Sequence, residues 1–96
     1  MDWALTYRRS EAFLFQRMGE QAYLIPYKDG VASLTDVHVL DSEVALRVWE
    51  LLDGRTPLGD VRRAVVEEFE APPEVIEADL EGFVGDLVRI GGVVAS

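Results

Sequence analysis

The segment from Val39 to Gly54, with the sequence VLDSEVALRVWELLDG, constrains the fold more than any other part of the chain. The apolar pair Val39-Leu40 is typical of a strand end. Asp41 follows it and is predicted to accept hydrogen bonds from the first free N–H groups of a helix. Gly54 is predicted to end that helix in the left-handed conformation. Apolar side chains recur at helical spacing between these ends, which predicts a buried face made by Val44, Val48, Leu51 and Leu52, flanked by Ala45 and Trp49.

Two short aromatic and aliphatic runs precede this segment. Residues 13–18 (FLFQRM) and residues 22–25 (AYLI) are separated by Gly19-Glu20, a pattern typical of a β-hairpin. Pro26 is expected to end the second strand, because proline has no N–H to donate to a neighbouring strand.

A third strand is predicted within residues 34–40 (LTDVHVL), where polar and apolar residues alternate. Val37 and Val39 would share one face of this strand, and Asp36 and His38 the other. Asp36 and His38 could form a surface polar pair on an edge strand, or a general base with an orienting carboxylate, as in a small hydrolase.

After Gly54 the chain is predicted to be mainly helical. Thr56-Pro57 supplies an N-cap and a proline at the first helical position of a second helix. Its apolar stripe consists of Leu58, Val61, Val65 and Phe69. Pro72-Pro73 breaks the chain and opens a third helix, from about Pro73 to Ile90, which Gly91-Gly92 stops. The apolar residues of this helix are Val75, Ile76, Leu80, Phe83, Val84, Leu87 and Val88.

The order of these elements predicts an α+β fold that resembles a winged helix-turn-helix. A three-stranded antiparallel sheet would be followed by three helices packed on one side of it. A chain of 96 residues is long enough for one modest core and too short for two, so residues 1–96 are expected to form a single domain.

The net charge of −9 is placed unevenly along the chain. Residues 1–40 hold five acidic and four basic side chains, whereas residues 41–96 hold thirteen acidic and five basic ones. Such a domain repels phosphate backbones, so no nucleic-acid partner is expected. The charge indicates either a solvated acidic surface or an attraction to a basic peptide or protein.

Several classes of site have no support in the sequence. There is no cysteine, which excludes disulfides, thiolate metal sites and cysteine nucleophiles. Serine nucleophile motifs, GxxxxGK[ST], GxGxxG and the calcium-binding loop pattern are all missing, so the motifs give no support for an enzyme or a cofactor. No signal peptide or bilayer-spanning stretch is apparent, which indicates a cytoplasmic protein with no membrane partner. Asp79 falls beside the apolar stripe of the third helix, where it could cap or salt-bridge locally, or contact a ligand.

The region from Val37 to Val94 resembles the PqqD-like family, which includes the pyrroloquinoline quinone biosynthesis protein D. Asp41 stands where the family usually has asparagine, and residues 26–35 match poorly. The ordered motifs that carry the resemblance are Val39-Leu40-Asp41, Val48-Trp49-Glu50-Leu51-Leu52-Asp53-Gly54, Arg55-Thr56, Phe69, Pro72-Pro73, Asp79-Leu80, Phe83-Val84, Leu87 and Gly91-Gly92-Val93-Val94.

The resemblance implies a non-catalytic peptide chaperone, and thus neither an enzyme nor a cofactor. Domains of this family serve as recognition elements for ribosomally synthesised precursor peptides. The leader of the precursor adds as a β-strand and is presented to a modifying enzyme, often a radical S-adenosylmethionine protein. The implied strand residues are Asp36, Val37, His38, Val39 and Leu40. The implied helix residues are Ile76, Asp79, Leu80, Phe83, Val84 and Leu87, of which about half are expected to touch peptide.

Two matters stay open at this point. The domain could be a monomer or a homodimer, because exposed edge strands permit both. The alternative function is that of a winged-helix regulatory protein that binds DNA or a protein partner. That alternative needs a basic recognition helix, and the third helix has only Arg89 as a base.

Overall fold

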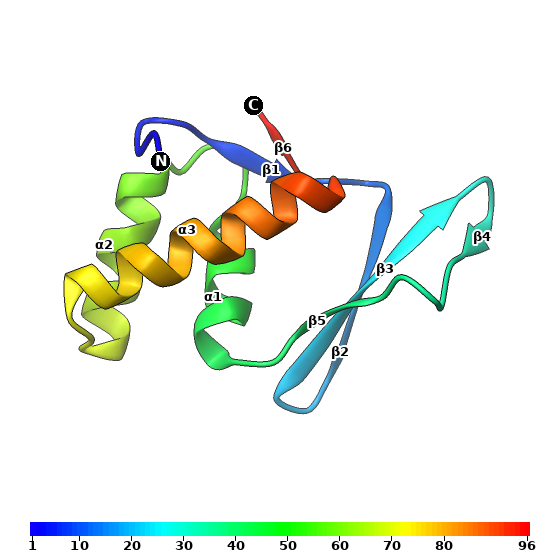
Figure 1. Ribbon diagram of the computed structural model, residues 1–96, viewed down its shortest axis with the longest axis horizontal. Helices are drawn as coiled ribbons and strands as arrows, with labels where there is room; N and C mark the ends of the chain where they lie inside the picture. The colour runs from blue at the N-terminus through cyan, green and yellow to red at the C-terminus, as the bar shows by residue number, and fades with distance from the viewer.

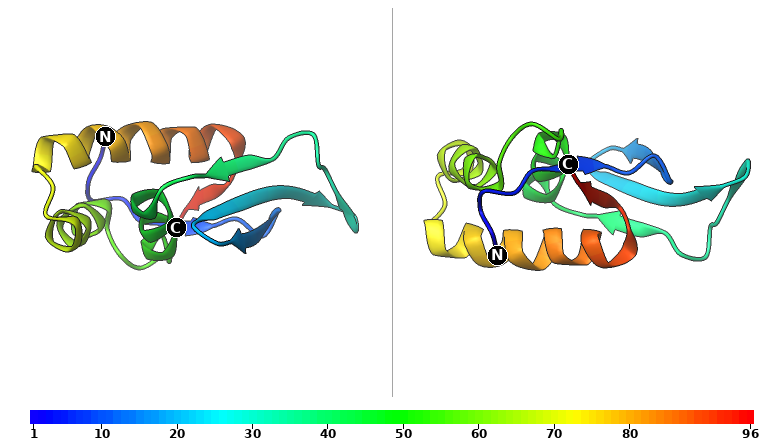
Figure 2. Two further views of the ribbon diagram at one scale, coloured as in Figure 1. Left: turned by 90° about the horizontal axis from the view of Figure 1, so that it is seen from below. Right: turned by 90° about the horizontal axis from the view of Figure 1, so that it is seen from above.

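The helices gather at one end of the molecule, and a β-hairpin extends away from them (Figures 1 and 2). The computed structural model describes all residues 1–96. The elements in chain order are β1 (Tyr7–Arg9), β2 (Phe13–Met18), β3 (Gln21–Lys28), β4 (Val31–Ala32), β5 (His38–Leu40), α1 (Glu43–Leu51), α2 (Leu58–Phe69), α3 (Pro73–Ile90) and β6 (Val93–Ala95). The α+β class and the order of hairpin, third strand and three helices are as predicted.

The predicted sheet of three strands is wrong in its strand count. β3 lies at the centre of a four-stranded antiparallel sheet, with β2 on one side and both β4 and β5 on the other. A second, two-stranded sheet joins β1 to β6, and Arg8 lies opposite Val94 in it. The three strands that the sequence did not predict have two or three residues each, too few for any alternating pattern to be visible.

Pro26 does not end its strand, contrary to the prediction. β3 continues to Lys28, and Pro26 lies opposite Phe13 of β2. The next residue, Tyr27, donates its N–H to the carbonyl of Ala12 at 2.8 Å, and the Pro26 carbonyl accepts the N–H of Ser33 at 2.8 Å. The missing donor of proline is therefore tolerated, because neighbouring groups continue the pairing on both sides.

The inward and outward faces of β5 are the reverse of the prediction. The strand spans only His38–Leu40, and Leu40 is buried whereas Val39 is 44% exposed. Leu40 and His38 lie opposite Ala22 and Leu24 of β3, both of which are fully buried, whereas Val39 lies opposite Tyr23. Because paired residues point to the same face of a sheet, the partner strand decides which side of β5 faces the core.

Helix α1 is capped by Ser42 and not by Asp41. The Ser42 hydroxyl oxygen accepts the N–H of Ala45 at 3.0 Å, while the Asp41 carboxylate forms no hydrogen bond. Both residue types cap helices well, and the position at which β5 leaves the sheet places serine at the first turn.

Replacing Ser42 by alanine is expected to lower the free energy of unfolding by about 1 kcal/mol, because the Ala45 N–H at the start of α1 loses the side-chain acceptor that caps it. Urea denaturation measures the change. The matched variant Asp41→Ala should change the unfolding free energy by less than about 0.5 kcal/mol. A larger loss from Asp41→Ala than from Ser42→Ala would contradict the assignment of the cap.

At the start of α2, backbone carbonyls and not the Thr56 side chain accept the free N–H groups. The predicted capping role of Thr56 is therefore wrong. The helix begins at Leu58, with Pro57 in the cap position and no side-chain cap. The N–H groups of Leu58 and Gly59 donate to the carbonyls of Leu5 and Trp3 at 2.9 and 2.8 Å. A segment more than fifty residues away therefore supplies what a capping side chain would otherwise provide.

Thr56 instead belongs to a turn organised by Asp53. The Asp53 carboxylate accepts the N–H groups of Arg55 and Thr56, each at 2.9 Å, and the Thr56 hydroxyl at 3.1 Å. These hydrogen bonds, led by that from Arg55, hold the pKa of Asp53 below its ordinary value of 3.8. Gly54 has the predicted left-handed conformation, with φ +80°, and donates its N–H to the Tyr7 carbonyl, although α1 already ends at Leu51.

The lowered pKa of Asp53 predicts a pH dependence of stability. The stabilisation is fully present above the unfolded pKa, near 3.8, and is lost as the pH falls through the lower folded pKa. Asp53→Asn should therefore reduce stability at pH 7 but flatten its decline below about pH 4. Unfolding curves measured from pH 2 to 7 on both proteins test this. An unchanged decline in the variant would show that Asp53 does not contribute.

The core lies between the helices and the inner face of the larger sheet. Trp49, predicted to flank the buried face of the first helix, is itself buried, with 5% of its surface exposed. Helix α3 spans Pro73–Ile90 as predicted, and Gly91 ends it at φ +79°. None of the three helices combines the length and the apolar character that crossing a membrane requires. The core residues are Ala22, Leu24, Leu40, Leu46, Val48, Trp49, Leu52, Leu58, Val61, Val65, Ile76, Leu80, Val84, Leu87 and Val93.

Candidate functional site

Strand β5 offers an open sheet edge. It pairs with β3 on one side only, and no strand lies on its other side. No backbone group of residues 34–41 forms a hydrogen bond outside the sheet. Such an edge presents N–H and C=O groups in register and can accept a further strand.

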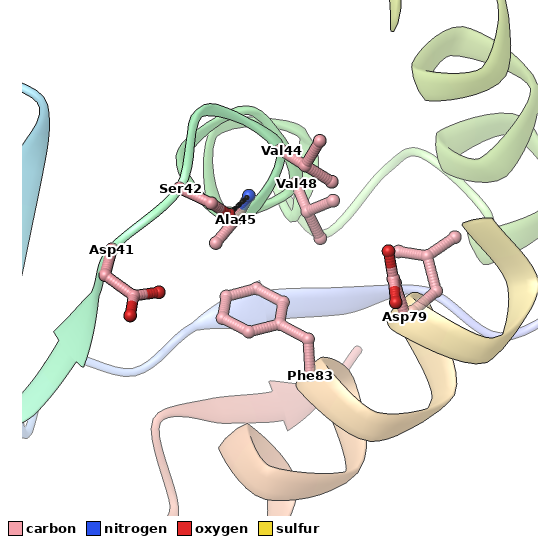
Figure 3. A pocket seen from close by; sticks show the side chains of 8 residues that line it. Asp41, Ser42, Val44, Ala45, Val48, Asp79 and Phe83 are labelled. Atoms are coloured by element: carbon pink, nitrogen blue, oxygen red, sulfur yellow. Dashed lines mark hydrogen bonds between the residues drawn. The ribbon is translucent and has the colours of Figure 1, made fainter. Parts of the chain in front are cut away.

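A pocket of about 380 Å³ opens where β5 leads into α1, between the start of α1 and the middle of α3 (Figure 3). Phe83 projects from α3 toward α1, and Asp41 and Asp79 lie on opposite sides of it. Five of the eight lining residues are hydrophobic, and the full lining consists of Asp41, Ser42, Val44, Ala45, Val48, Asp79, Leu80 and Phe83.

The structure divides the predicted helix residues into two groups. Asp79, Leu80 and Phe83 line the pocket. Ile76, Val84 and Leu87 have 2% or less of their surface exposed and belong to the core alone, whereas Leu80, 1% exposed, belongs to both the core and the pocket lining. That about half of the six helix residues touch peptide stays a prediction, for which Asp79, Leu80 and Phe83 are the candidates.

The predicted strand residues lie along the edge and not in the pocket. Val39 is exposed, Leu40 is buried in the core, and Asp36 and Val37 lie just before the strand. The Asp36 carboxylate accepts a hydrogen bond from the Ser33 hydroxyl at 3.3 Å and forms none with His38. The structure therefore does not assemble the Asp36–His38 pair that a hydrolase would need, and no cluster of histidine and acidic side chains is arranged to hold a metal ion.

The sequence did not predict the contribution of α1 to the site. Ser42 and Ala45 form one wall together with Val44 and Val48. The helical spacing of Val44 and Val48 was visible, but the pattern could not separate a wall of the pocket from the core, because both are apolar.

Asp41 and Asp79 form no hydrogen bond or ion pair, so Asp79 has none of the local partners that the sequence allowed. Other acidic side chains of the helices do have partners. Arg47 joins α1 to α2 through two hydrogen bonds to Glu68, at 2.8 and 2.9 Å, and these lower the pKa of the Glu68 carboxyl. The remaining ion pairs are Arg47–Glu50, Arg62–Glu77, Arg63–Asp60 and Arg89–Asp86.

The open edge of β5 and the neighbouring pocket between α1 and α3 together form the candidate groove of this domain. The fold is shared with the solved structure of TbiB1 in complex with the TbiA(beta) leader peptide, at a TM-score of 0.69. The alignment covers 90% of this chain and 93% of that chain, with 20% sequence identity. No curated protein sequence matches the chain.

The family model for coenzyme PQQ synthesis protein D (PqqD) matches residues 36–93. The chain therefore belongs to the PqqD family, as its motifs indicated. The matched region begins just before β5 and ends in β6, so it contains the open strand, the pocket and all three helices.

Proposed function

We propose that this protein recognises the leader of a ribosomally synthesised precursor peptide and presents it to a modifying enzyme. The observation that carries the proposal is the open edge of β5 beside the pocket between α1 and α3. Membership of the PqqD family supports it, and so does a fold shared with a protein that was solved with a leader peptide bound.

The geometry suits strand addition. A peptide that extends the sheet beyond β5 gains backbone hydrogen bonds along Val39 and its neighbours, which provide affinity whatever the peptide sequence. Side chains of an added strand alternate between its two faces, so those on one face can reach the pocket and give selectivity. Recognition would thus combine backbone pairing along β5 with side-chain selection by the pocket of α1 and α3.

The proposed role is that of an adaptor without chemistry of its own. The domain would bind no cofactor and act in the cytoplasm, and the partner would be a maturase, such as a radical S-adenosylmethionine enzyme. We also propose that the three helices and the sheet correspond to a winged helix-turn-helix architecture. A DNA-binding role is not favoured, because α3 carries Glu74, Glu77, Asp79, Glu81 and Asp86 against the single base Arg89.

The test is a titration of isotope-labelled protein with the leader region of the precursor encoded beside it, followed by amide chemical shifts. Saturable shifts concentrated at residues 36–45 and 76–87 are expected. Chemical-shift changes confined to other surfaces would show that the peptide does not bind along β5, α1 and α3. A salt-sensitive gel shift with duplex DNA would favour the regulatory alternative.

A further inference from the structure

The pocket combines an apolar lining with two carboxylates that lack partners. Asp41 lies at the end of β5 and Asp79 on α3, with Phe83 between them (Figure 3). The arginines of the three helices pair with other acids. No lysine, arginine or histidine lines the pocket.

The rest of the lining suits the stem of a long side chain. Val44 and Ala45, both half-buried, present aliphatic surface between the two acids, and the nearly buried Val48 and Leu80 complete the apolar lining. Lysine and arginine bury their methylene stems along such surface and keep the charged head near polar groups. The ring of Phe83 adds attraction, because the face of an aromatic ring is electrostatically negative.

Other occupants fit this lining less well. An acidic side chain would meet two like charges without a compensating cation. A purely apolar side chain would use the aliphatic wall but would bring Asp41 and Asp79 no partner and displace part of their water.

We infer that this pocket binds a lysine or arginine side chain of the peptide that adds to β5, at the point where the added strand passes Leu40 and Asp41. The inference rests on the proposed function and specifies its substrate class: leaders with one basic anchor residue. The surplus of acids in residues 41–96 would speed the approach of such a peptide, and the pocket would fix its position.

Selection of peptides by the intact protein tests the inference without a known precursor. Random 12-residue peptides are displayed on mRNA and selected against three proteins: the wild type, Asp41→Asn/Asp79→Asn, and Glu67→Gln/Glu81→Gln. Glu67 and Glu81 are exposed and unpaired, so the last variant changes the net charge equally without touching the pocket. The site at which each enriched peptide binds is then located from the amide chemical shifts of the isotope-labelled protein.

The affinity measurement uses one enriched, groove-binding peptide and its analogue with norleucine in place of the basic residue. Norleucine keeps the stem and removes the charge. The analogue is expected to bind the wild type and the Glu67→Gln/Glu81→Gln variant about tenfold more weakly, but the Asp41→Asn/Asp79→Asn variant less than about twofold more weakly.

The possible failures separate the two proposals. Groove-binding peptides with no basic preference, or an equal norleucine effect in all three proteins, would overturn the basic anchor and leave leader recognition standing. A selection that yields no peptide in the groove would overturn both.

Discussion

Replacing Trp49 by alanine is expected to lower the free energy of unfolding by about 3–5 kcal/mol. Trp49 is 5% exposed, and its ring stacks on that of Phe15 with centroids 6.0 Å apart and planes at 16°. The substitution removes the largest side chain of the core and leaves a cavity between α1 and β2. A domain of this size is stabilised by about 5–14 kcal/mol in total, so much of its stability would be lost.

Urea unfolding followed by far-ultraviolet circular dichroism measures the effect of Trp49→Ala. Trp49→Phe is the matched control, because it keeps an aromatic ring at the stacking position and should cost clearly less than the alanine variant. A loss below about 1 kcal/mol for Trp49→Ala would mean that this face of α1 does not carry the core.

Filling the pocket should abolish most peptide binding while leaving the fold intact. Ala45 lies on the pocket wall contributed by α1, and Ala45→Phe would place a ring in the space that we propose for a peptide side chain. Losing the burial of one such side chain corresponds to about 1.5–3 kcal/mol, or a dissociation constant weaker by about 10- to 100-fold. Peptides from the selection or the adjacent leader serve as probes, with affinity measured by fluorescence anisotropy.

Ala78→Phe provides the control for Ala45→Phe. Ala78 is exposed on α3 and lines no pocket, so this variant has the same cost in helix propensity, about 0.5 kcal/mol, without blocking the groove. Both variants should unfold within about 1 kcal/mol of the wild type. Equal binding by the two variants would show that the peptide does not occupy the pocket.

The variants Trp49→Ala and Ala45→Phe distinguish the two roles of α1, which are packing in the core and lining the pocket. One face of this short helix holds the core through Trp49 and Leu46, and the adjacent face forms the wall of the pocket through Ala45 and Val44, while Val48 belongs to both. A mutation at Trp49 acts on the amount of folded protein, whereas one at Ala45 acts on the affinity of the folded protein for peptide.

Much of the site could be predicted only in outline. The resemblance to the family implied β5 and α3 as recognition elements, which stays a prediction, and three of the six helix residues named from it line the pocket. The contribution of α1 was missed, and the unpaired state of Asp41 was hidden because aspartate is as good an N-cap as serine. Only the exit of the chain from β5 decides that Ser42, and not Asp41, caps the helix.

The sequence by itself determined the features that repeat along the chain. Helix α3 was predicted from Pro73 to Ile90 because eighteen residues with apolar side chains at three- and four-residue steps, closed by proline and glycine, leave little alternative. The β2–β3 hairpin and the burial of Trp49 followed from equally local signals. The tertiary structure alone decided the face of β5, the pairing of β1 with β6 and the carbonyl caps of α2, because each depends on a partner distant in sequence. A strand of three residues has no period from which its inner face can be inferred, so that face is set by the residues of β3 that lie opposite.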